Sequence, residues 1–226
     1  MMMESSPTTA RVGHPSKEDA AETSDRIIDA AARLFADQGF AATTNEQVAS
    51  ACGAGKDTIH RRFPSKAALF AAVTERMRAR TLDGLEAEID SADGDALSRL
   101  KRVARWFLAV NLEPDMIALN RIALSEAILL GESRAGPWET EPEESDPVTE
   151  RLVALVAAAQ WDGKLGGGDP RVIAAHLLHS IVTGPSHDAM LGRWTYASME
   201  AQDRFFDQAW ALFLRGAGRS LPAGAR

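Results

Sequence analysis

The feature that most constrains the fold is the run of residues 43–66, TTNEQVASACGAGKDTIHRRFPSK, because it predicts two short helices separated by a tight turn. Thr44 and Gln47 have the spacing of a capping box, in which each side chain bonds a free backbone amide at the start of a helix. Gly53 and Gly55 then predict the end of that helix and a turn. Two short helices joined in this way are typical of a helix-turn-helix.

The second of these helices, residues 56–63, has an apolar face and a polar face. Ile59 and Phe63 are four residues apart, so both lie on one side and can pack on a small core. Asp57 and Arg61 point the opposite way. An exposed helix with polar and basic side chains suits the major groove of DNA, which is bordered by phosphates. The residues predicted to contact DNA are Thr44, Lys56, Asp57, Thr58, His60, Arg61, Arg62 and Lys66.

A helix before this run completes a three-helix unit. Ser24 is placed to cap its start, and Gly39 is placed to end it in a left-handed conformation. Apolar residues recur between them at helical spacing. We therefore predict a DNA-binding domain over residues 23–69, preceded by a polar, flexible arm over residues 1–22.

The remaining residues, 70–226, are predicted to form a second helical domain. Apolar residues recur at intervals of three and four, without the two-residue alternation of a strand. Predicted helices cover residues 65–82, 96–112, 115–130, 147–161, 170–183 and 200–215. Breaks are expected in the acidic segment 131–147 and at Gly184-Pro185. The sequence therefore predicts an all-α protein.

The net charge of −7 does not exclude DNA binding, because the charge is unevenly distributed. Residues 55–80 carry seven basic and two acidic side chains, a net charge of +5. Residues 132–150 carry seven acidic side chains and one basic side chain, a net charge of −6. Charges beyond a Debye length of about 10 Å are largely screened, so association with a polyanion follows the local basic patch.

The sequence also bears on the compartment. The single cysteine, Cys52, excludes an internal disulfide framework and fits a reducing environment. No apolar run is long enough to span a bilayer, and the first residues lack the basic and apolar regions of a secretory signal. We therefore expect a cytoplasmic protein without a membrane partner.

Several motifs occur together in the first third of the chain: LFADQGF at residues 34–40, Thr43-Thr44, Thr58-Ile59 and FPSK at residues 63–66. This combination resembles the DNA-binding domain of TetR-family transcriptional regulators, over about residues 24–73. The chain departs from the family at Asp57, where a small residue is usual, and at residues 60–62, where aromatic residues are common. Base contacts are therefore not carried over, and Asp57 could accept a hydrogen bond from cytosine or simply repel phosphate.

The region from Asn111 through residues 116–121 to Gly184-Pro185 is similar to the C-terminal domain of a TetR subgroup related to AefR-like and AcrR-like regulators. Its middle helices mix apolar walls with a few polar groups, as ligand cavities do. An ordinary helical core has the same mixture and stays open as the alternative for each residue. The residues predicted to line a small-molecule pocket are Trp106, Phe107, Asn111, Asn120, Ser125, Glu126 and His176.

The last two predicted helices carry broad apolar surfaces, at residues 172–182 and 205–213. A second copy of this helix pair would cover them in a four-helix bundle about a two-fold axis. TetR-like regulators dimerise through their last two helices, so the resemblance implies the same arrangement; the alternative is that both helices belong to the core of one chain. The predicted dimer-interface residues are Ile173, Leu177, Leu178, Ile181, Phe206, Trp210 and Phe213.

Candidate motifs for other chemistry are incomplete. The segment 53–58, GAGKDT, lacks the first glycine, the final Ser or Thr and the preceding strand of a phosphate-binding loop. His176, His179 and His187 lack a cysteine or acidic partner at metal-ligand spacing, so no metal site is predicted. The adjacent residues 186–188, SHD, cannot converge as a catalytic triad. We expect neither an enzyme nor a bound cofactor.

The sequence and the resemblance together predict a homodimeric, ligand-responsive transcriptional regulator. Its expected partners are double-stranded operator DNA, a second copy of the chain and a small-molecule effector. The resemblance implies a repressor that a small apolar molecule releases from a palindromic operator. The alternative is an all-helical DNA- or protein-binding module without small-molecule regulation.

Overall fold

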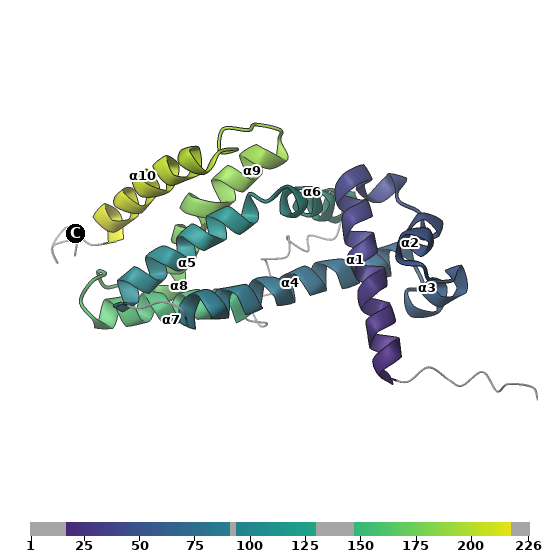
Figure 1. Cartoon of the computed structure of the whole chain (residues 1–226). Coiled ribbons are helices and arrows are strands. Elements are labelled where there is room, and N and C mark those ends of the chain that lie inside the picture. The colour runs from purple at the N-terminus through teal and green to yellow at the C-terminus, as the bar shows by residue number, and fades with distance from the viewer. Residues whose placement is uncertain (1–16, 91–93, 130–146, 218–226) are drawn as a thin grey trace, which may run out of the picture.

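The computed structural model describes residues 17–90, 94–129 and 147–217, and every regular element within them is helical. The predicted all-α fold is confirmed. A small group of helices lies at one end of the long helix α4 and a larger group at its other end (Figure 1). The elements are α1 (Lys17–Ala42), α2 (Asn45–Cys52), α3 (Lys56–Arg62), α4 (Lys66–Asp90), α5 (Ala96–Asn111), α6 (Pro114–Leu129), α7 (Pro147–Trp161), α8 (Pro170–Leu178), the π-helix η1 (His179–Thr183), α9 (Gly184–Met190) and α10 (Met199–Ala217).

The first helix begins earlier than predicted. α1 starts at Lys17, inside the segment predicted to be a flexible arm. Ser24 lies within the helix, where its hydroxyl donates to the carbonyl of Ala20 at 3.2 Å instead of capping the N-terminus. The physical reason is that the residues after Lys17 combine alanine with acidic side chains, which favour the first turns of a helix. The remainder of the predicted arm lies outside the described residues.

The predicted interruption at Gly39 is present. Gly39 has φ 84° and ψ 166°, and one short helical turn follows it up to Ala42. Glycine adopts a positive φ without the steric cost that a Cβ atom would bring. The kink lets the chain leave α1 and enter α2 within a few residues.

A compact first core joins α1, α2, α3 and the beginning of α4. Its fully buried side chains come from all four helices and are Ile27, Ala31, Phe35, Val48, Ile59, Leu69 and Val73. These are the positions that face inward at helical spacing. We call the part of the chain that surrounds this core, residues 17–77, the reading module.

The second core surrounds α5, which contacts α4, α6, α7, η1, α9 and α10. Its fully buried side chains include Leu85, Leu100, Val103, Leu108, Leu152, Val156, Leu177 and Ile181. We call the elements around this core the C-terminal domain. Because α4 continues to Asp90, past the predicted end near Leu82, it contributes to both cores without a break.

The expected break at Gly184-Pro185 is absent, and this prediction was wrong. The chain stays helical from α8 through η1 into α9, and the amide of Gly184 donates to the carbonyl of His179 in the wider π-helical pattern. Proline lacks an amide donor and its ring clashes with the carbonyl four residues earlier. A single turn of π-helix shifts that pairing, so Pro185 is accommodated at the start of α9.

One helix of the C-terminal domain reaches the reading module. α6 packs along α1. Leu119 is 3% exposed and belongs to the first core, with Ile122 and Ala123 packed against it. The two cores are therefore joined by α4 and, independently, by α6.

Candidate nucleic-acid interface

The turn between α1 and α2 is held by a dense set of side-chain hydrogen bonds. The backbone amide of Thr44 donates to Gln47 Oε1 at 2.8 Å, and the amide of Gln47 donates to Thr44 Oγ1 at 3.2 Å, so the predicted capping box is present. Gln38 Nε2 donates to Gln47 Oε1 at 3.0 Å and to Thr43 Oγ1 at 3.2 Å. The hydroxyl of buried Thr43 donates to the carbonyl of Gly39 at 2.8 Å. These bonds fix the angle at which α2 leaves α1.

Lys66, at the start of α4, closes the same turn from the other side. Its ammonium donates to the carbonyls of Phe40 at 2.7 Å, Thr43 at 3.1 Å and Ala41 at 3.2 Å, and lies 4.5 Å from the centroid of the Phe40 ring. Lysine has three donors, and all three are used here. Lys66, which was predicted to contact DNA, therefore binds the carbonyl end of α1 instead of projecting from the surface.

The turn between α2 and α3 follows the glycine pattern of the sequence. Gly53 has φ 66° and ψ 24°, and its amide donates to the carbonyl of Ala49, which ends α2 in the left-handed conformation. Lys56, the first residue of α3, forms an ion pair with Glu46 on α2. This hydrogen bond and charge lower the pKa of the Glu46 carboxyl and raise the pKa of Lys56. The two helices are thus tied together on the solvent side as well as through their core.

The exposed face of α3 contains most of the residues predicted to contact DNA. Ile59 is fully buried and seats the helix on the first core. Asp57, His60 and Arg61 are exposed, and Thr58 is half-buried. The structure therefore brings these side chains onto one surface beside exposed Thr44 and Lys56.

Arg62 differs from the prediction, because it faces α1 rather than solvent. Its side chain is half-buried and Nη1 donates to Ser24 Oγ. Its Nε atom is buried and has no hydrogen-bond partner among the described residues. Arg62 lies at the edge of the apolar face of α3. Its guanidinium turns inward because Ser24 of α1 lies within reach as a hydrogen-bond acceptor. Arg62, which was predicted to contact DNA, therefore joins α3 to α1.

Two further cations of the basic segment are also paired. Arg76 and Arg80 of α4 form ion pairs with Asp25 and Asp29 of α1, the second at 3.0 Å. From the sequence, Ser24 and Asp25 were assigned only to the start of a helix, and Glu46 and Asp29 were given no role. Acidic residues spaced by four on α1, opposite basic residues spaced by four on α4, are a signal that could have indicated the pairing.

Within the described residues, the side chains predicted to line a small-molecule pocket differ in burial. Phe107 and Asn111 are buried in the second core, where Asn111 Nδ2 donates to the carbonyl of Phe107 at 2.9 Å. Trp106 is half-buried against Gly84, at which a Cβ atom would lie 2.7 Å from the Trp106 ring. Asn120 is half-buried on α6, whereas Ser125 and His176 are exposed, and the side chain of Glu126 lies outside the described part.

The predicted dimer-interface residues divide into two groups. Leu177, Ile181, Phe206 and Trp210 are at most 5% exposed in the single chain and pack in the second core. A side chain already covered by its own chain offers little surface to a partner. Ile173, Leu178 and Phe213 are half-buried.

An open, largely apolar groove runs between α8 and α10 on the outside of the C-terminal domain. Leu212, which lines this groove, is 64% exposed, and Val172 of α8 is 51% exposed; neither was among the residues predicted for the dimer interface. The angular positions on each helix could have indicated them, since both point away from the buried stripe. The groove is lined by Ile173, His176, Ser180, Phe205, Gln208, Ala209, Leu212, Phe213 and Gly216.

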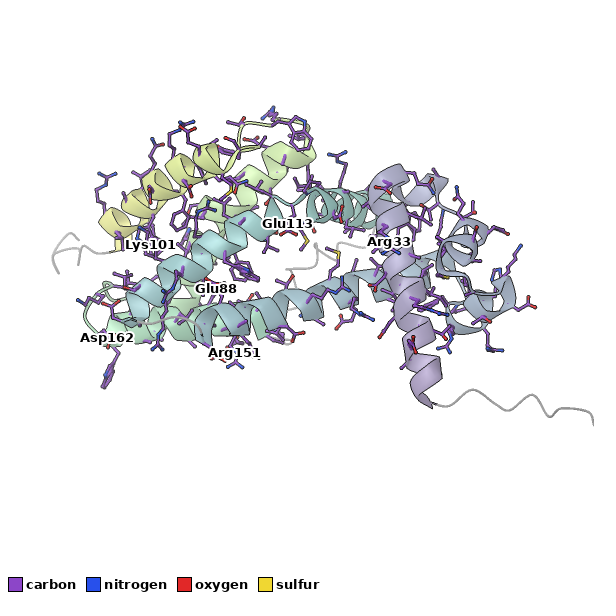
Figure 2. All side chains as sticks on the ribbon, in the orientation of Figure 1. Arg33, Glu88, Lys101, Glu113, Arg151 and Asp162 are labelled. Atoms are coloured by element: carbon purple, nitrogen blue, oxygen red, sulfur yellow. The ribbon has the colours of Figure 1, made fainter. Side chains whose placement is uncertain are left out.

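Charged side chains of the C-terminal domain lie far from α3. Figure 2 shows Lys101, Arg151 and Asp162 at the end of the molecule opposite the reading module, whereas Arg33 lies on α1. No helix within the described ranges is both long and apolar enough to cross a lipid bilayer. In the same ranges, no three His, Cys, Asp or Glu side chains are grouped so that they could hold a metal ion.

A three-helix unit with a capped α2, a tight turn and an exposed polar α3 defines a helix-turn-helix DNA-binding protein. Comparison with known families gives the same class. Residues 27–73 match the model of the bacterial regulatory proteins of the TetR family. Residues 98–216, more than half of the chain, match the C-terminal domain of AefR-like transcriptional repressors. The chain belongs to the TetR family of transcriptional regulators.

Individual relatives agree with this assignment. The chain is 34% identical over 88 residues to the transcriptional regulator AcrR of Shigella flexneri. These aligned residues make up 38% of this chain and 40% of AcrR. The chain thus spans less than half the length of the first curated relatives that it matches, 19% of one and 40% of the other.

Solved structures extend the similarity to the whole fold. A TetR-family regulator from Mesorhizobium loti superposes with a TM-score of 0.76 at 23% identity, covering 91% of this chain and 100% of that one. The flavonoid-responsive regulator FrrA superposes with a TM-score of 0.58 at 25% identity, covering 88% and 100%.

Proposed function

We propose that this protein is a homodimeric repressor that binds a palindromic operator through α3 and that a small apolar molecule releases from it. The observation that carries the proposal is the exposed polar face of α3 on a helix whose position is fixed. Ile59 seats the helix, and the contacts of Lys56 and Arg62 tie it to α2 and α1. A recognition element held in this way can present side chains to base edges at a constant register.

The proposed DNA-contacting set is smaller than the set predicted from sequence. It contains the exposed or half-exposed side chains of this surface. It omits Lys66, whose ammonium binds backbone carbonyls, and Arg62, which turns toward α1 and donates to Ser24. We assign Arg61 to a base edge because it points directly away from the buried Ile59. The members of the proposed set are Thr44, Lys56, Asp57, Thr58, His60 and Arg61.

The reading role is tested by operator binding measured with fluorescence anisotropy. DNA upstream of the coding sequence serves as the source of candidate operators. Arg61→Ala is expected to weaken binding by about 1–3 kcal/mol and to relax one operator position. Arg151→Ala is the matched control, because Arg151 is an exposed arginine at the far end of the molecule. Equal operator affinity in wild type and Arg61→Ala would contradict the proposed reading role of α3.

We further propose that two chains associate through the groove between α8 and α10. Ile173 of α8 and Leu212 and Phe213 of α10 line the groove, so both helices contribute apolar surface to it, and Leu212 is 64% exposed. A second copy related by a two-fold axis would cover it with the same surface. Two α3 helices in such a dimer would meet half-sites about one DNA turn, 34–36 Å, apart or a multiple of it.

The dimer is tested by placing a charge on the exposed part of this groove. Leu212→Glu is expected to give a folded monomer in sedimentation analysis, because an unpaired carboxylate in an apolar interface is costly to desolvate. Leu191→Glu is the control, since Leu191 is similarly exposed but does not line the groove. An intact dimer of the Leu212→Glu variant, with helix content unchanged, would rule out this interface.

The proposed regulation acts through α6. Leu119 of α6 lies in the core of the reading module, and Ile122 packs beside it, while the same helix contacts α5 and α9 of the C-terminal domain. A ligand that displaces α6 would therefore move α1 and the spacing of the two α3 helices. The similarity to a flavonoid-responsive regulator supports an apolar, aromatic class of effector.

Regulation is tested by titrating a panel of flavonoids and other apolar aromatics in the presence and absence of operator. A coupling of about 1–3 kcal/mol corresponds to a change in affinity of roughly 5–150-fold, and operator must weaken the effector by the same factor. An effector that binds equally well in both titrations does not regulate DNA binding. Leu119→Ala is expected to reduce the coupling factor, because it removes the contact through which α6 would act.

A further inference from the structure

The acidic residue Asp57 is unusual on the surface that we propose meets a polyanion. It lies in the first turn of α3, where a carboxylate stabilises the positive end of the helix. This effect explains why a carboxylate is stabilising in the first turn of α3, but it does not explain why the side chain of Asp57 faces outward. Its side chain is exposed, and among the described residues it has no hydrogen-bond or ion-pair partner.

Arg61 stands four residues after Asp57, so the two side chains lie on the same strip of α3. Arg61 is exposed and likewise has no partner in the described part of the chain. The neighbouring cations already have partners within the chain: Lys56 forms an ion pair with Glu46, and Arg62 donates to Ser24. The acid and the base on the outward strip are therefore both available to DNA.

The chemistry of the major groove restricts what each of these groups can bind. A carboxylate only accepts hydrogen bonds, and the donors in the groove are the amino groups of cytosine and adenine. Adenine presents an acceptor, N7, beside its amino group, and that acceptor repels a carboxylate. A guanidinium only donates, and guanine presents two adjacent acceptors, O6 and N7.

We infer that Asp57 and Arg61 are paired specificity determinants, with Asp57 accepting from the amino group of a cytosine and Arg61 donating to a guanine. The inference rests on the proposed function, namely that α3 lies in the major groove. Four residues of helix rise about 6 Å along the axis. Base pairs are stacked about 3.4 Å apart, so the two positions read are one or two steps apart.

The test is selection of bound sequences from a random double-stranded DNA library by the full-length protein. Wild type is expected to enrich a cytosine at one position of each half-site and a guanine one or two positions away. D57N is expected to lose the preference for that cytosine by at least about fivefold in favour of adenine, because an amide bonds adenine in a bidentate manner. The guanine preference should remain in this variant, whereas R61A should lose guanine and keep cytosine.

Asp37→Asn is the charge control, because it removes the same charge from exposed Asp37 on α1. Two outcomes for D57N would overturn the inference. Tighter binding to all sequences with unchanged base frequencies would mean that Asp57 only repels phosphate. Loss of guanine instead of cytosine would mean that Asp57 merely orients Arg61. Failure of wild type to enrich any sequence would instead refute the proposed function, so the two failures are distinguishable.

Discussion

The reading module and the C-terminal domain are stabilised by different kinds of contact. In the reading module, polar side chains close the turns: Gln38 and Gln47 bridge α1 and α2, and Lys66 binds three carbonyls. The C-terminal domain is held mainly by apolar packing around α5. Its ion pairs among the described residues involve exposed or half-exposed side chains, and Gln160 closes one turn by donating to the carbonyls of Gly166 and Gly168. It also leaves large apolar side chains in solvent, including Leu212 and Val172.

This difference indicates how the two parts meet their partners. A surface that reads DNA needs side chains at fixed positions, and directional hydrogen bonds provide that precision at turns. A surface that associates with an identical copy needs continuous apolar area, which is non-directional. The comparison predicts that changes in the reading module alter geometry and stability together, whereas changes on the outer α8 and α10 face alter association alone.

The largest expected effect comes from the aromatic cluster of the reading module. Phe35 is fully buried, and its ring centroid lies 5.5 Å from those of both Phe40 and Phe70. Phe35→Ala should lower the free energy of unfolding by about 3–5 kcal/mol, through lost burial and an unfilled cavity. Urea titration followed by circular dichroism measures this. Leu212→Ala should stay within about 0.5 kcal/mol in the same assay at a concentration where the chain is monomeric.

Lys66→Met should have the next largest effect. The substitution keeps the apolar stem but leaves the carbonyls of Phe40, Ala41 and Thr43 without their common donor. We expect a loss of about 1–3 kcal/mol in the free energy of unfolding. Lys164→Met, at an exposed lysine of the C-terminal domain, should leave the urea midpoint unchanged. An equal shift of the urea midpoint in Lys66→Met and Lys164→Met would show that polar contacts stabilise the reading module no more than the C-terminal domain.

The capping box should contribute less. Thr44→Ala removes the oxygen that accepts from the amide of Gln47 and should cost about 1 kcal/mol. Ser50→Ala is the control, because Ser50 is an exposed residue inside the same helix. Thr44→Ala should also weaken operator binding, because the start of α2 fixes the position of α3. If the free energy of unfolding of Thr44→Ala is no lower than that of Ser50→Ala, the cap does not stabilise the protein.

The smallest effect is a dependence of stability on pH shared by both regions. The hydrogen bond to Lys56 lowers the pKa of Glu46, and the hydrogen bond from Ser98 lowers the pKa of Asp95. A carboxyl whose pKa is lowered by folding stabilises the protein when it is ionised. This stabilisation is present above the ordinary carboxyl values, 4.5 for Glu46 and 3.8 for Asp95, and is lost as pH falls through the lowered values.

Thermal unfolding between pH 3 and 6 measures this dependence. Glu46→Gln and Asp95→Asn should each flatten the fall in melting temperature on acidification. Substituting Glu113, an exposed acid for which no ion pair is found among the described residues, is the control. A pH profile of both variants identical to that of wild type would show that these contacts add nothing in solution.

Features that depend on neighbouring residues were predicted well from the sequence. The capping box at Thr44 and Gln47, the positive φ at Gly53 and the inward direction of Ile59 all follow from spacings of a few residues. So do the bounds of α7, Pro147–Trp161, which begin at a proline and end before a glycine. The physical reason is that capping, turn conformation and helical periodicity are local properties of the backbone.

Local reasoning failed where a helix continued through an apparent break. Gly184-Pro185 predicts a stop, yet η1 shifts the hydrogen-bond pattern by one residue and α9 continues. Ser24 has the chemistry of a cap, yet it lies inside α1 and accepts from Arg62. At Ser24, the helix-favouring residues after Lys17 outweigh the capping preference of one serine; at Pro185, the single π-helical turn removes the conflict that proline brings.

The helical class, the helix-turn-helix unit and the family follow from residue types and their spacing. Which side chains of that unit stay exposed depends on how its helices pack. Arg61 and Arg62 are adjacent and chemically identical, but Arg61 is exposed whereas Arg62 bonds Ser24 on α1. The same holds for Leu177, which is 1% exposed, and Leu212, which is 64% exposed, although both lie on apolar helices. Helical periodicity gives the direction of a side chain, but its burial depends on what another part of the chain places there.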